Sequence, residues 1–503
     1  MSKNGLNRFV PDAYRPYLNS SDYHNHPIQI IPEVISNNQE KMMKTISDVF
    51  DAIPIRDGMT LSFHHHLRNG DDVFNMVLDE IKHRQLKNMI LAPSAIFPHN
   101  DRLCELIEQQ NVVQIFTNYL NGAVSQTINE GKLRDYLIME THGGRARSIE
   151  TGELAIDVCF AAAPCADRNG NANGIDGPSA CGSLGYIIPD IKHAKVKVLV
   201  TDHLVPEVKR CEIEGKYVDY IVTVPRIGDQ VGIVSGTTKI TKDPIGLKIA
   251  RDTAILLQEA GYLKDGFSMQ TGAGGISLAV TDEVRKIMER EHIKASFASG
   301  GITAYFVNLL EKKMIETLYD VQCFDLEAVR SYRENPQHIG MSSSQYANPY
   351  HPEVVVDRLD FVILGATEID VDFNVNVTTS STGKIMGGSG GHADAAHGAH
   401  LTIITTNLLK SRLPIIKEKV TTITTPGEDV DVLVTEWGIA INPKRVDLMT
   451  KLQNAPLKIV PIEKLLTMAH QMAGAPATLN HKDKVIGVVK YRDGSIIDTL
   501  YQW

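Results

Sequence analysis

The sequence has little of what defines several protein classes. Its 503 residues include six cysteines and no C-x-x-C pair, which is too few for a disulfide scaffold. Aromatic residues make up only 6% of the chain, and the formal net charge of -9 comes with no long basic run. This composition argues against a surface that binds nucleic acid.

Long hydrophobic segments are also missing. No apolar run approaches the roughly 20 residues that a membrane-spanning helix needs, and the opening residues MSKNGLNRFVPDAYRP carry scattered charges. We therefore expect a cytoplasmic protein that does not bind a membrane. With a hydrophobic fraction of 43%, a chain of this length is expected to form two large domains.

An internal repeat is present. Three pairs of segments match in the same order along the chain: 57–62 with 265–270, 163–173 with 366–376, and 218–223 with 430–435. The second pair shares the pattern A-x-x-x-D-x-x-x-N-x-N. Because a duplicated unit constrains the architecture strongly, we predict two related halves.

The periodicity of both halves indicates an α/β fold. Apolar runs such as MILAPSAIF and DFVILGA are typical of parallel strands covered on both faces, whereas residues 71–84 and 281–291 have the spacing of amphipathic helices. We predict two tandem, open α/β domains, joined near residues 235–246. The predicted boundaries are an N-terminal extension at 1–45, a first domain at 46–238 and a second domain at 239–503.

Glycine-rich loops follow two of the predicted strands, at the place where open α/β sheets bind ligands. Gly272, Gly274 and Gly275 form the first loop, whose backbone amides could approach a ligand closely. The second loop, 386–392, follows soon after a strand ending in Glu368. A carboxylate beside several amide donors suits attack on a thioester carbonyl, because the donors stabilise the oxyanion that forms.

The two halves differ at this carboxylate. Cys165 occupies the position in the first repeat that Glu368 occupies in the second. We therefore expect only the second half to carry the chemistry. Glu436, which follows the last repeated strand, is a candidate substrate-binding residue and the rival candidate for the catalytic carboxylate.

Basic side chains in the first half suggest recognition of an anion. His64, His65, Arg68 and Arg145 are candidate substrate ligands, because an acid with several carboxylates needs fixed cationic donors. The histidines lie in no H-E-x-x-H pattern, and no carboxylate stands beside them at ligand spacing. We therefore predict no metal site.

Several motifs together resemble the coenzyme A transferase superfamily, whose domains have a NagB/RpiA-like fold. They are G-A-G-G-I-S-L-A-V, A-T-E-I-D-V-D-F-N-V-N, M-G-G-S-G-G-H-A-D and V-L-V-T-E-W-G-I-A. The segments D-G-M-T-L-S-F-H-H-H-L-R-N-G-D and A-P-C-A-D-R-N-G-N-A-N-G are similar, more narrowly, to the citrate lyase alpha subunit family. That resemblance runs nearly from end to end.

The resemblance implies a citrate CoA-transferase. Citrate would displace acetate from an acetyl thioester, and a lyase subunit would cleave the citryl thioester to oxaloacetate and acetate. The thioester would be acetyl-CoA or the CoA-like prosthetic group of an acyl carrier subunit, and no metal is implied. The expected partners are citrate, the acetyl thioester, the carrier and lyase subunits, and further copies of the chain in a homo-oligomer.

The resemblance also assigns roles to residues. Glu368 matches the superfamily's acylated glutamate, and Gly387 or Gly388 its oxyanion donor. The thioester arm would lie along the Gly272–Gly275 loop, and it would be bordered by three further glycines: Gly300, Gly301 and Gly390. The citrate lyase branch is expected to use a ternary complex and a mixed anhydride, which would make Glu368 a positioning residue instead of a nucleophile.

Other functions stay open on the sequence. A citramalate-type CoA-transferase, an acyl-CoA hydrolase and a non-catalytic scaffold subunit share most of these features. A sugar-phosphate isomerase on a related fold would need a lysine beside a carboxylate, for which Lys384 is the nearby candidate.

Overall fold

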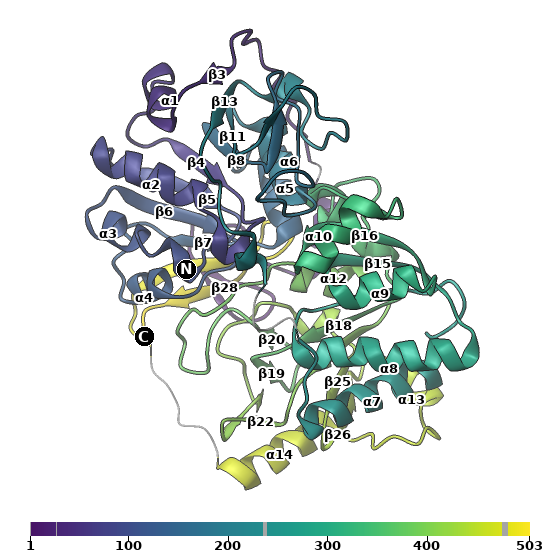
Figure 1. Ribbon diagram of the computed structural model, residues 1–503. Helices are drawn as coiled ribbons and strands as arrows, with labels where there is room; N and C mark the ends of the chain where they lie inside the picture. The colour runs from purple at the N-terminus through teal and green to yellow at the C-terminus, as the bar shows by residue number, and fades with distance from the viewer. Residues whose placement is uncertain (1, 27, 235–238, 475–480) are drawn as a thin grey trace.

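The computed structural model describes residues 2–26, 28–234, 239–474 and 481–503, and two large sheets organise them (Figure 1). The first sheet has the order β28 (Ile496–Tyr501), β27 (Val485–Lys490), β7 (Leu137–Met139), β6 (Val112–Thr117), β5 (Met89–Pro93), β4 (Thr60–Phe63), β8 (Val158–Ala162), β11 (Val196–Thr201), β13 (Tyr220–Thr223) and β3 (Met42–Met43). The second has the order β17 (His338–Gly340), β16 (Ile315–Cys323), β15 (Ala295–Ile302), β14 (Ser268–Thr271), β18 (Phe361–Gly365), β21 (Thr402–Thr405), β25 (Val432–Thr435) and β26 (Gly438–Ile441).

The predicted repeat is confirmed by the order of these strands. The run β7-β6-β5-β4-β8-β11-β13 of the first sheet has the same succession as β17-β16-β15-β14-β18-β21-β25 of the second. Each half also carries a small sheet: β10 (Ala172–Asn173), β9 (Cys165–Asp167) and β12 (Leu204–Val205) in the first, and β20 (Val375–Asn376), β19 (Glu368–Asp370) and β24 (Ile416–Lys417) in the second.

The shared pattern A-x-x-x-D-x-x-x-N-x-N has a structural cause. In the first half, an Asp167 side-chain oxygen accepts the backbone amides of Asn169 and Asn171. In the second half, Asp370 accepts the corresponding amides of Asp372 and Asn374. The repeated aspartate therefore holds the turn between the antiparallel strands of each small sheet.

Helices cover the sheets, as the α/β prediction requires. The first half carries α2 (Val73–His83), α3 (Leu103–Glu108), α4 (Ala123–Asn129), α5 (His142–Glu150) and α6 (Ile188–His193); the second carries α7 (Pro244–Glu259), α8 (Gly275–Glu291), α9 (Ala304–Glu311), α10 (Leu326–Glu334), α11 (Ser343–Ala347), α12 (His392–Gly398) and α14 (Ile462–Ala473). The helices predicted at 71–84 and 281–291 correspond to α2 and to the later part of α8. No helix among the described residues is long and apolar enough to cross a membrane.

The chain ends depart from the predicted domain boundaries. The last strands, β27 and β28, return to the first sheet, where β27 pairs in parallel with β7, and β3 from the N-terminal extension pairs with β13 (Figure 1). The boundaries 46–238 and 239–503 therefore follow chain order and not sheet membership. The C-terminal strands pair with the first sheet because β7 would otherwise be an unpaired edge strand. Of the predicted linker, residues 235–238 lie outside the described residues.

The return of the C-terminal strands can be tested by Leu500→Ala, because Leu500 is only 2% exposed within β28. Such a truncation costs about 2–5 kcal/mol, and we expect it to raise amide exchange in the first sheet. Hydrogen-exchange mass spectrometry should show that the substitution increases the exchange rate, relative to wild type, more in residues 112–139 of the first sheet than in residues 295–323 of the second. Leu413→Ala, at a half-exposed position, is the control. Faster exchange confined to 295–323 would contradict the arrangement.

Candidate active site

The histidines after β4 are buried and neutral. His64 and His65 are 5% and 6% exposed, and His66 is 1% exposed. The Nε2 atom of His64 accepts the amide of Ala162, and His65 Nδ1 lies 2.6 Å from the hydroxyl of Ser94. Burial lowers the pKa of His64 to about 3, and that of His65 falls well below its usual value. These imidazoles therefore offer hydrogen bonds and no charge near pH 7.

Arg68 is a partly buried cation without an anionic partner. Its guanidinium lies 4.7 Å from the ring of Phe324 and 5.9 Å from that of Phe97. Within the described residues it forms no ion pair, and its buried Nη1 has no hydrogen-bond partner. Desolvation lowers the pKa of Arg68, but an arginine remains charged at neutral pH. A guanidinium in this state favours an anionic ligand.

A cavity of about 620 Å³ opens beside Arg68. Its wall includes Phe97, Tyr119, Asn121 and Val231. Tyr119 follows β6, so the carboxyl ends of neighbouring strands of the first sheet supply this wall, as expected for an open α/β sheet.

The second glycine loop packs against the same strand ends. The carbonyl of Gly387 accepts the amide of Leu120, and the amide of Gly390 donates to the carbonyl of Asn118. A Cβ on Gly388 would lie 2.2 Å from the Asn118 oxygen, so only glycine fits there. A Cβ on Gly387 would come within 4.0 Å of the Tyr119 ring. The loop therefore lies next to the Arg68 cavity, and the amide of Gly388 has no acceptor in the described part of the chain.

Glu368 lies elsewhere, in the small sheet of the second half. It is 0% exposed, and its carboxylate accepts from the side chain of Asn376 at 2.9 Å and the amide of Thr421 at 2.8 Å. The ammonium of Lys417 lies 3.7 Å away. The structure thus surrounds Glu368 with partners and does not place it in the wall of the Arg68 cavity. Glu368 is connected to the glycine loop through Asn376: the side chain of Asn376 accepts the amide of Thr378, and the carbonyl of Thr378 accepts the amide of Gly387.

The other predicted glycines fall into two groups. Gly272, Gly274 and Gly275 connect β14 to α8; a Cβ on Gly274 would meet nothing within 4 Å, so this loop is open. Gly300 and Gly301 end β15. A Cβ on Gly301 would lie 2.3 Å from the Phe324 ring, so this glycine makes room for the ring that stacks on Arg68.

Two predicted substrate ligands are reassigned. Arg145 is 3% exposed, and its guanidinium donates to both carboxylate oxygens of Asp190, at 2.7 and 2.8 Å. It also donates to the carbonyl of Ala92, so it supports the interior and does not face the cavity. Glu436 lies in the turn between β25 and β26, at the edge of the second sheet, and accepts the amide of Leu408.

His142, which the sequence reasoning missed, lies beside the second glycine loop. Its ring lies 4.3 Å from the tilted ring of Tyr186 and is stacked with that of His65 at 6.0 Å, and its buried Nδ1 has no partner among the described residues. Burial lowers the pKa of His142 to about 3. A Cβ on Gly390 would lie 3.3 Å from its Nε2. The signal was available, because His142 lies three residues after the apolar run LIM, much as Tyr119 lies two residues after VVQIFT.

The comparisons with known proteins identify the family. Residues 39–503 match the family model "Citrate lyase, alpha subunit (CitF)". The chain belongs to the citrate lyase alpha subunit family. It is 44% identical to the citrate lyase alpha chain of Klebsiella pneumoniae over 475 residues, which cover 94% of each chain. The citrate lyase alpha chain of Escherichia coli K12 is 45% identical over 463 residues, 92% of this chain and 91% of that one.

Solved structures share the fold. A Streptococcus mutans protein, solved as the alpha subunit of citrate lyase in complex with citrate, superposes with a TM-score of 0.95 at 40% identity and covers 99% of both chains. A malonate decarboxylase alpha subunit from Acinetobacter baumannii has a TM-score of 0.62 at 14% identity, covers 87% of this chain and 93% of that one, and shows the fold alone. The predicted α/β fold and family resemblance are confirmed.

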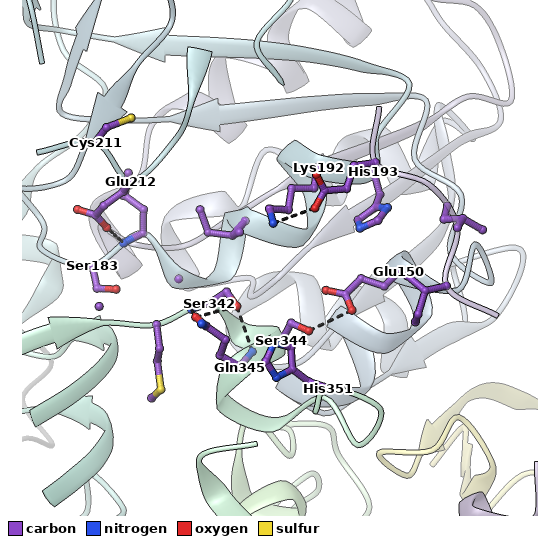
Figure 2. Close-up of a pocket in the computed structure, with 18 of the residues that line it drawn as sticks. Glu150, Ser183, Lys192, His193, Cys211, Glu212, Ser342, Ser344, Gln345 and His351 are labelled. Carbon is purple, nitrogen blue, oxygen red and sulfur yellow. Dashed lines mark hydrogen bonds and ion pairs between the residues drawn. The ribbon is translucent and has the colours of Figure 1, made fainter. Parts of the chain in front are cut away.

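A second cavity, of about 530 Å³, lies between α6 and α11 (Figure 2). Its charged side chains are largely paired with protein groups: Glu150 accepts the hydroxyl of Ser344 at 3.0 Å, and the Lys192 ammonium lies 2.9 Å from Glu33. None of the predicted site residues lines it. In the cavity beside Arg68 the carboxylates of Asp72 and Asp229 are also paired, with His99 and Arg226, so the unpaired guanidinium of Arg68 distinguishes the two cavities.

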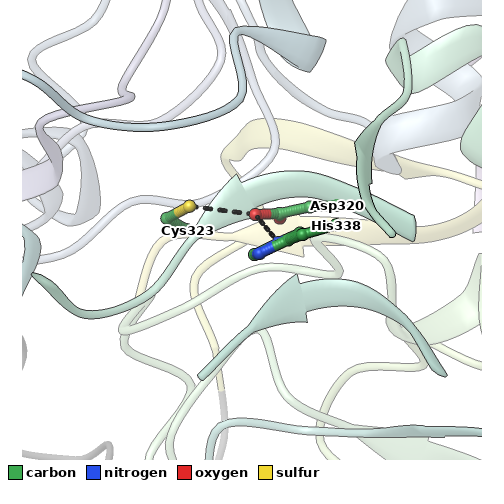
Figure 3. Close-up of side chains that lie close together, drawn as sticks. All are labelled: Asp320, Cys323 and His338. Carbon is green, nitrogen blue, oxygen red and sulfur yellow. Dashed lines mark hydrogen bonds and ion pairs between the residues drawn. The ribbon is translucent and has the colours of Figure 1, made fainter. Parts of the chain in front are cut away.

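One group of possible metal ligands occurs within the described ranges: Asp320, Cys323 and His338 (Figure 3). The thiol donates to an Asp320 oxygen at 2.9 Å, His338 Nε2 lies 3.0 Å from the same oxygen, and Ser331 occupies His338 Nδ1. Burial raises the pKa of the Cys323 thiol well above its usual value, which disfavours the thiolate that a metal needs. The three residues form a hydrogen-bonded network.

We expect Arg145→Met to destabilise the fold and not to abolish citrate binding directly. The substitution leaves the Asp190 carboxylate buried and unpaired, which costs about 3–5 kcal/mol. Thermal unfolding should show the loss, and the double variant Arg145→Met/Asp190→Asn should recover part of it. A folded Arg145→Met protein with normal stability and no affinity for citrate would instead return Arg145 to the substrate site.

Proposed function

We propose that this chain is the transferase subunit of a citrate lyase. It exchanges the acid half of an acetyl thioester for citrate, so that acetate leaves and a citryl thioester forms. The unpaired guanidinium of Arg68, beside a cavity next to the glycine loop, carries the proposal. Citrate brings three carboxylates, and the Streptococcus mutans relative was solved with citrate.

The reaction needs orientation and oxyanion donors more than strong acids or bases. A citrate carboxylate attacks the thioester carbonyl, and the tetrahedral oxyanion collapses to a citric-acetic anhydride as the thiolate leaves. The thiolate then attacks the citryl carbonyl, and acetate departs. The free amide of Gly388 is suited to each oxyanion. Because His65 and His142 stay neutral, they can donate hydrogen bonds without adding a mobile charge.

The thioester arm has a suitable place at the first glycine loop. The amides of Gly274 and Gly275 donate to no backbone carbonyl of the described chain, and the space beside Gly274 is open. Amides at the start of the long helix α8 favour the phosphate groups of a CoA-like arm. We assign the arm, carried by an acyl carrier subunit or present as acetyl-CoA, to this loop. The carrier subunit, the lyase subunit and further copies of this chain are the proposed partners.

Glu368 is proposed as a positioning residue. A nucleophile must reach the acyl carbon, and the carboxylate of Glu368 is instead enclosed by Asn376, Thr421 and Lys417. These contacts support direct exchange between citrate and the thioester, without a glutamyl thioester. The carboxylate holds the small sheet from which the glycine loop extends.

The proposal predicts that the pure chain releases acetate from acetyl-CoA only when citrate is present. Arg68→Gln should raise the KM for citrate by about 10- to 100-fold, because one charge-assisted contact with a carboxylate is lost. Arg102→Gln, at an exposed ion pair, is the matched control. Release of CoA without any acceptor acid would indicate a hydrolase. Binding of the thioester carrier without turnover would indicate a scaffold subunit, and a preference for citramalate over citrate would indicate a related transferase.

The role of Glu368 is tested by trapping. Borohydride would reduce a glutamyl thioester and so change the mass of the peptide that contains Glu368. Because we propose that no such thioester forms, this peptide should keep its mass when the wild-type chain is treated with acetyl-CoA and borohydride. Glu368→Gln should lower kcat by less than about tenfold, since removal of a nucleophile costs far more. A reduced Glu368 in the wild-type peptide would establish the covalent route instead.

A further inference from the structure

Asp394 joins the glycine loop of the second half to the first half of the molecule. It lies in the first turn of α12, three residues after Gly391, and is 0% exposed. One of its oxygens accepts the hydroxyl of Thr141 at 2.8 Å, and the other accepts the amide of Gly143 at 2.9 Å. Both partners belong to the segment that leaves β7, so one carboxylate connects the two repeats.

Arg492 supports this carboxylate from a third direction. It is 0% exposed and comes from the turn between β27 and β28, and its Nε lies 3.6 Å from Asp394. The guanidinium also donates to the carbonyl of Ala347 at 3.0 Å and lies 3.8 Å from Asp357. The carboxylate of Asp394 is therefore fixed between groups from both halves and from the C-terminal strands.

The surroundings leave no room for a shift. A Cβ on Gly143 would lie 2.0 Å from the carbonyl oxygen of Ala347 and 2.8 Å from Asp394. A Cβ on Gly391 would lie 2.3 Å from the hydroxyl of Tyr346. Two glycines thus permit the close approach on which the carboxylate's hydrogen bonds depend.

His142 lies between the two residues that Asp394 holds. Thr141 precedes it and Gly143 follows it, and the amide of His142 donates to the carbonyl of Gly390 at 2.8 Å. The position of the imidazole and the position of the glycine loop are therefore set by the same carboxylate. Arg68 lies on a different loop, after β4, which Asp394 does not contact.

We propose that Asp394 is a positioning residue that aligns the Gly388 amide with the His142 ring at the acyl carbon. The inference rests on the proposed transferase function. It deepens that function by separating alignment of the reacting groups, which depends on Asp394, from recognition of citrate, which depends on Arg68. A displacement of about 1 Å at a reacting centre costs up to about 100-fold in rate.

A pH dependence supports the same role. Burial raises the pKa of Asp394 to about 6, against the opposing charge of Arg492, and the further titratable groups that face it are His397, Tyr346 and Tyr186. Protonation puts a hydrogen on an oxygen that has to accept from Thr141 or Gly143, so alignment is lost as the pH falls through about 6. The expected effect is a fall in kcat on the acid side.

The test is Asp394→Asn in the full-length chain, assayed for acetate release from acetyl-CoA and citrate between pH 5 and 8. We expect kcat to fall by about 10- to 100-fold and the KM for citrate to change by less than about twofold. The decline of kcat below about pH 6, which is the acid limb of the pH profile, should disappear. Asp252→Asn, at an ion pair on the outside of α7, should behave as wild type. An unchanged kcat, or an acid limb that persists, would overturn the proposal.

A second pair of variants keeps the test decisive if Asp394→Asn does not fold. Thr141→Val removes one hydrogen bond at nearly constant shape and should lower kcat with little change in KM, whereas Thr141→Ser keeps the hydroxyl and should recover most of the rate. Equal rates for the two would contradict the role of Asp394. If the wild-type chain itself released no acetate, the transferase function would fail, independently of the alignment proposal.

Discussion

The structure depends on a contact between two backbones. The loop around Gly388 approaches Asn118 so closely that a single methyl group would collide with its carbonyl oxygen. This approach brings a chain segment from the second repeat onto the strand ends of the first. The pocket beside Arg68 and the stacked imidazoles belong to the first repeat, whereas the Phe324 ring that packs on Arg68 and the free amide of Gly388 come from the second, so neither repeat alone supplies the complete set.

The duplication explains both the symmetry of the scaffold and the asymmetry of the site. Asp167 and Asp370 hold equivalent turns, so the small sheets of the two halves are related in detail. Two residues before each of these aspartates the halves differ, because the first repeat has Cys165 where the second has Glu368. The carboxylate of Glu368 accepts the amide of Thr421 and lies near the ammonium of Lys417, so its contacts lie in the interior of the second half. Duplicated architecture therefore did not require duplicated chemistry.

Much of the fold could be predicted from local patterns, because continuous apolar runs and three- and four-residue spacing report directly on strands and helices. The first glycine loop and Arg68 were found for a similar reason, because each lies within five residues of the end of such a strand, whereas the second glycine loop was found by its density of glycine. Pairing between distant residues could not be predicted. Arg68 and Arg145 look alike in the sequence, and only the position of Asp190 shows that one of them is occupied. The enclosure of Glu368 by Thr421 and the return of β27 to β7 are likewise long-range contacts.

The outer strands of the first sheet also bear on biosynthesis. During translation β27 and β28 are made after all the other strands of the first sheet, so the edge of β7 stays open until residues 485–501 have emerged. An open edge invites pairing with other nascent chains. A chain interrupted shortly before residue 485 would lack Arg492 as well as these strands. The segment that closes the edge of β7 thus also completes the support behind the glycine loop, and products truncated before it lack both.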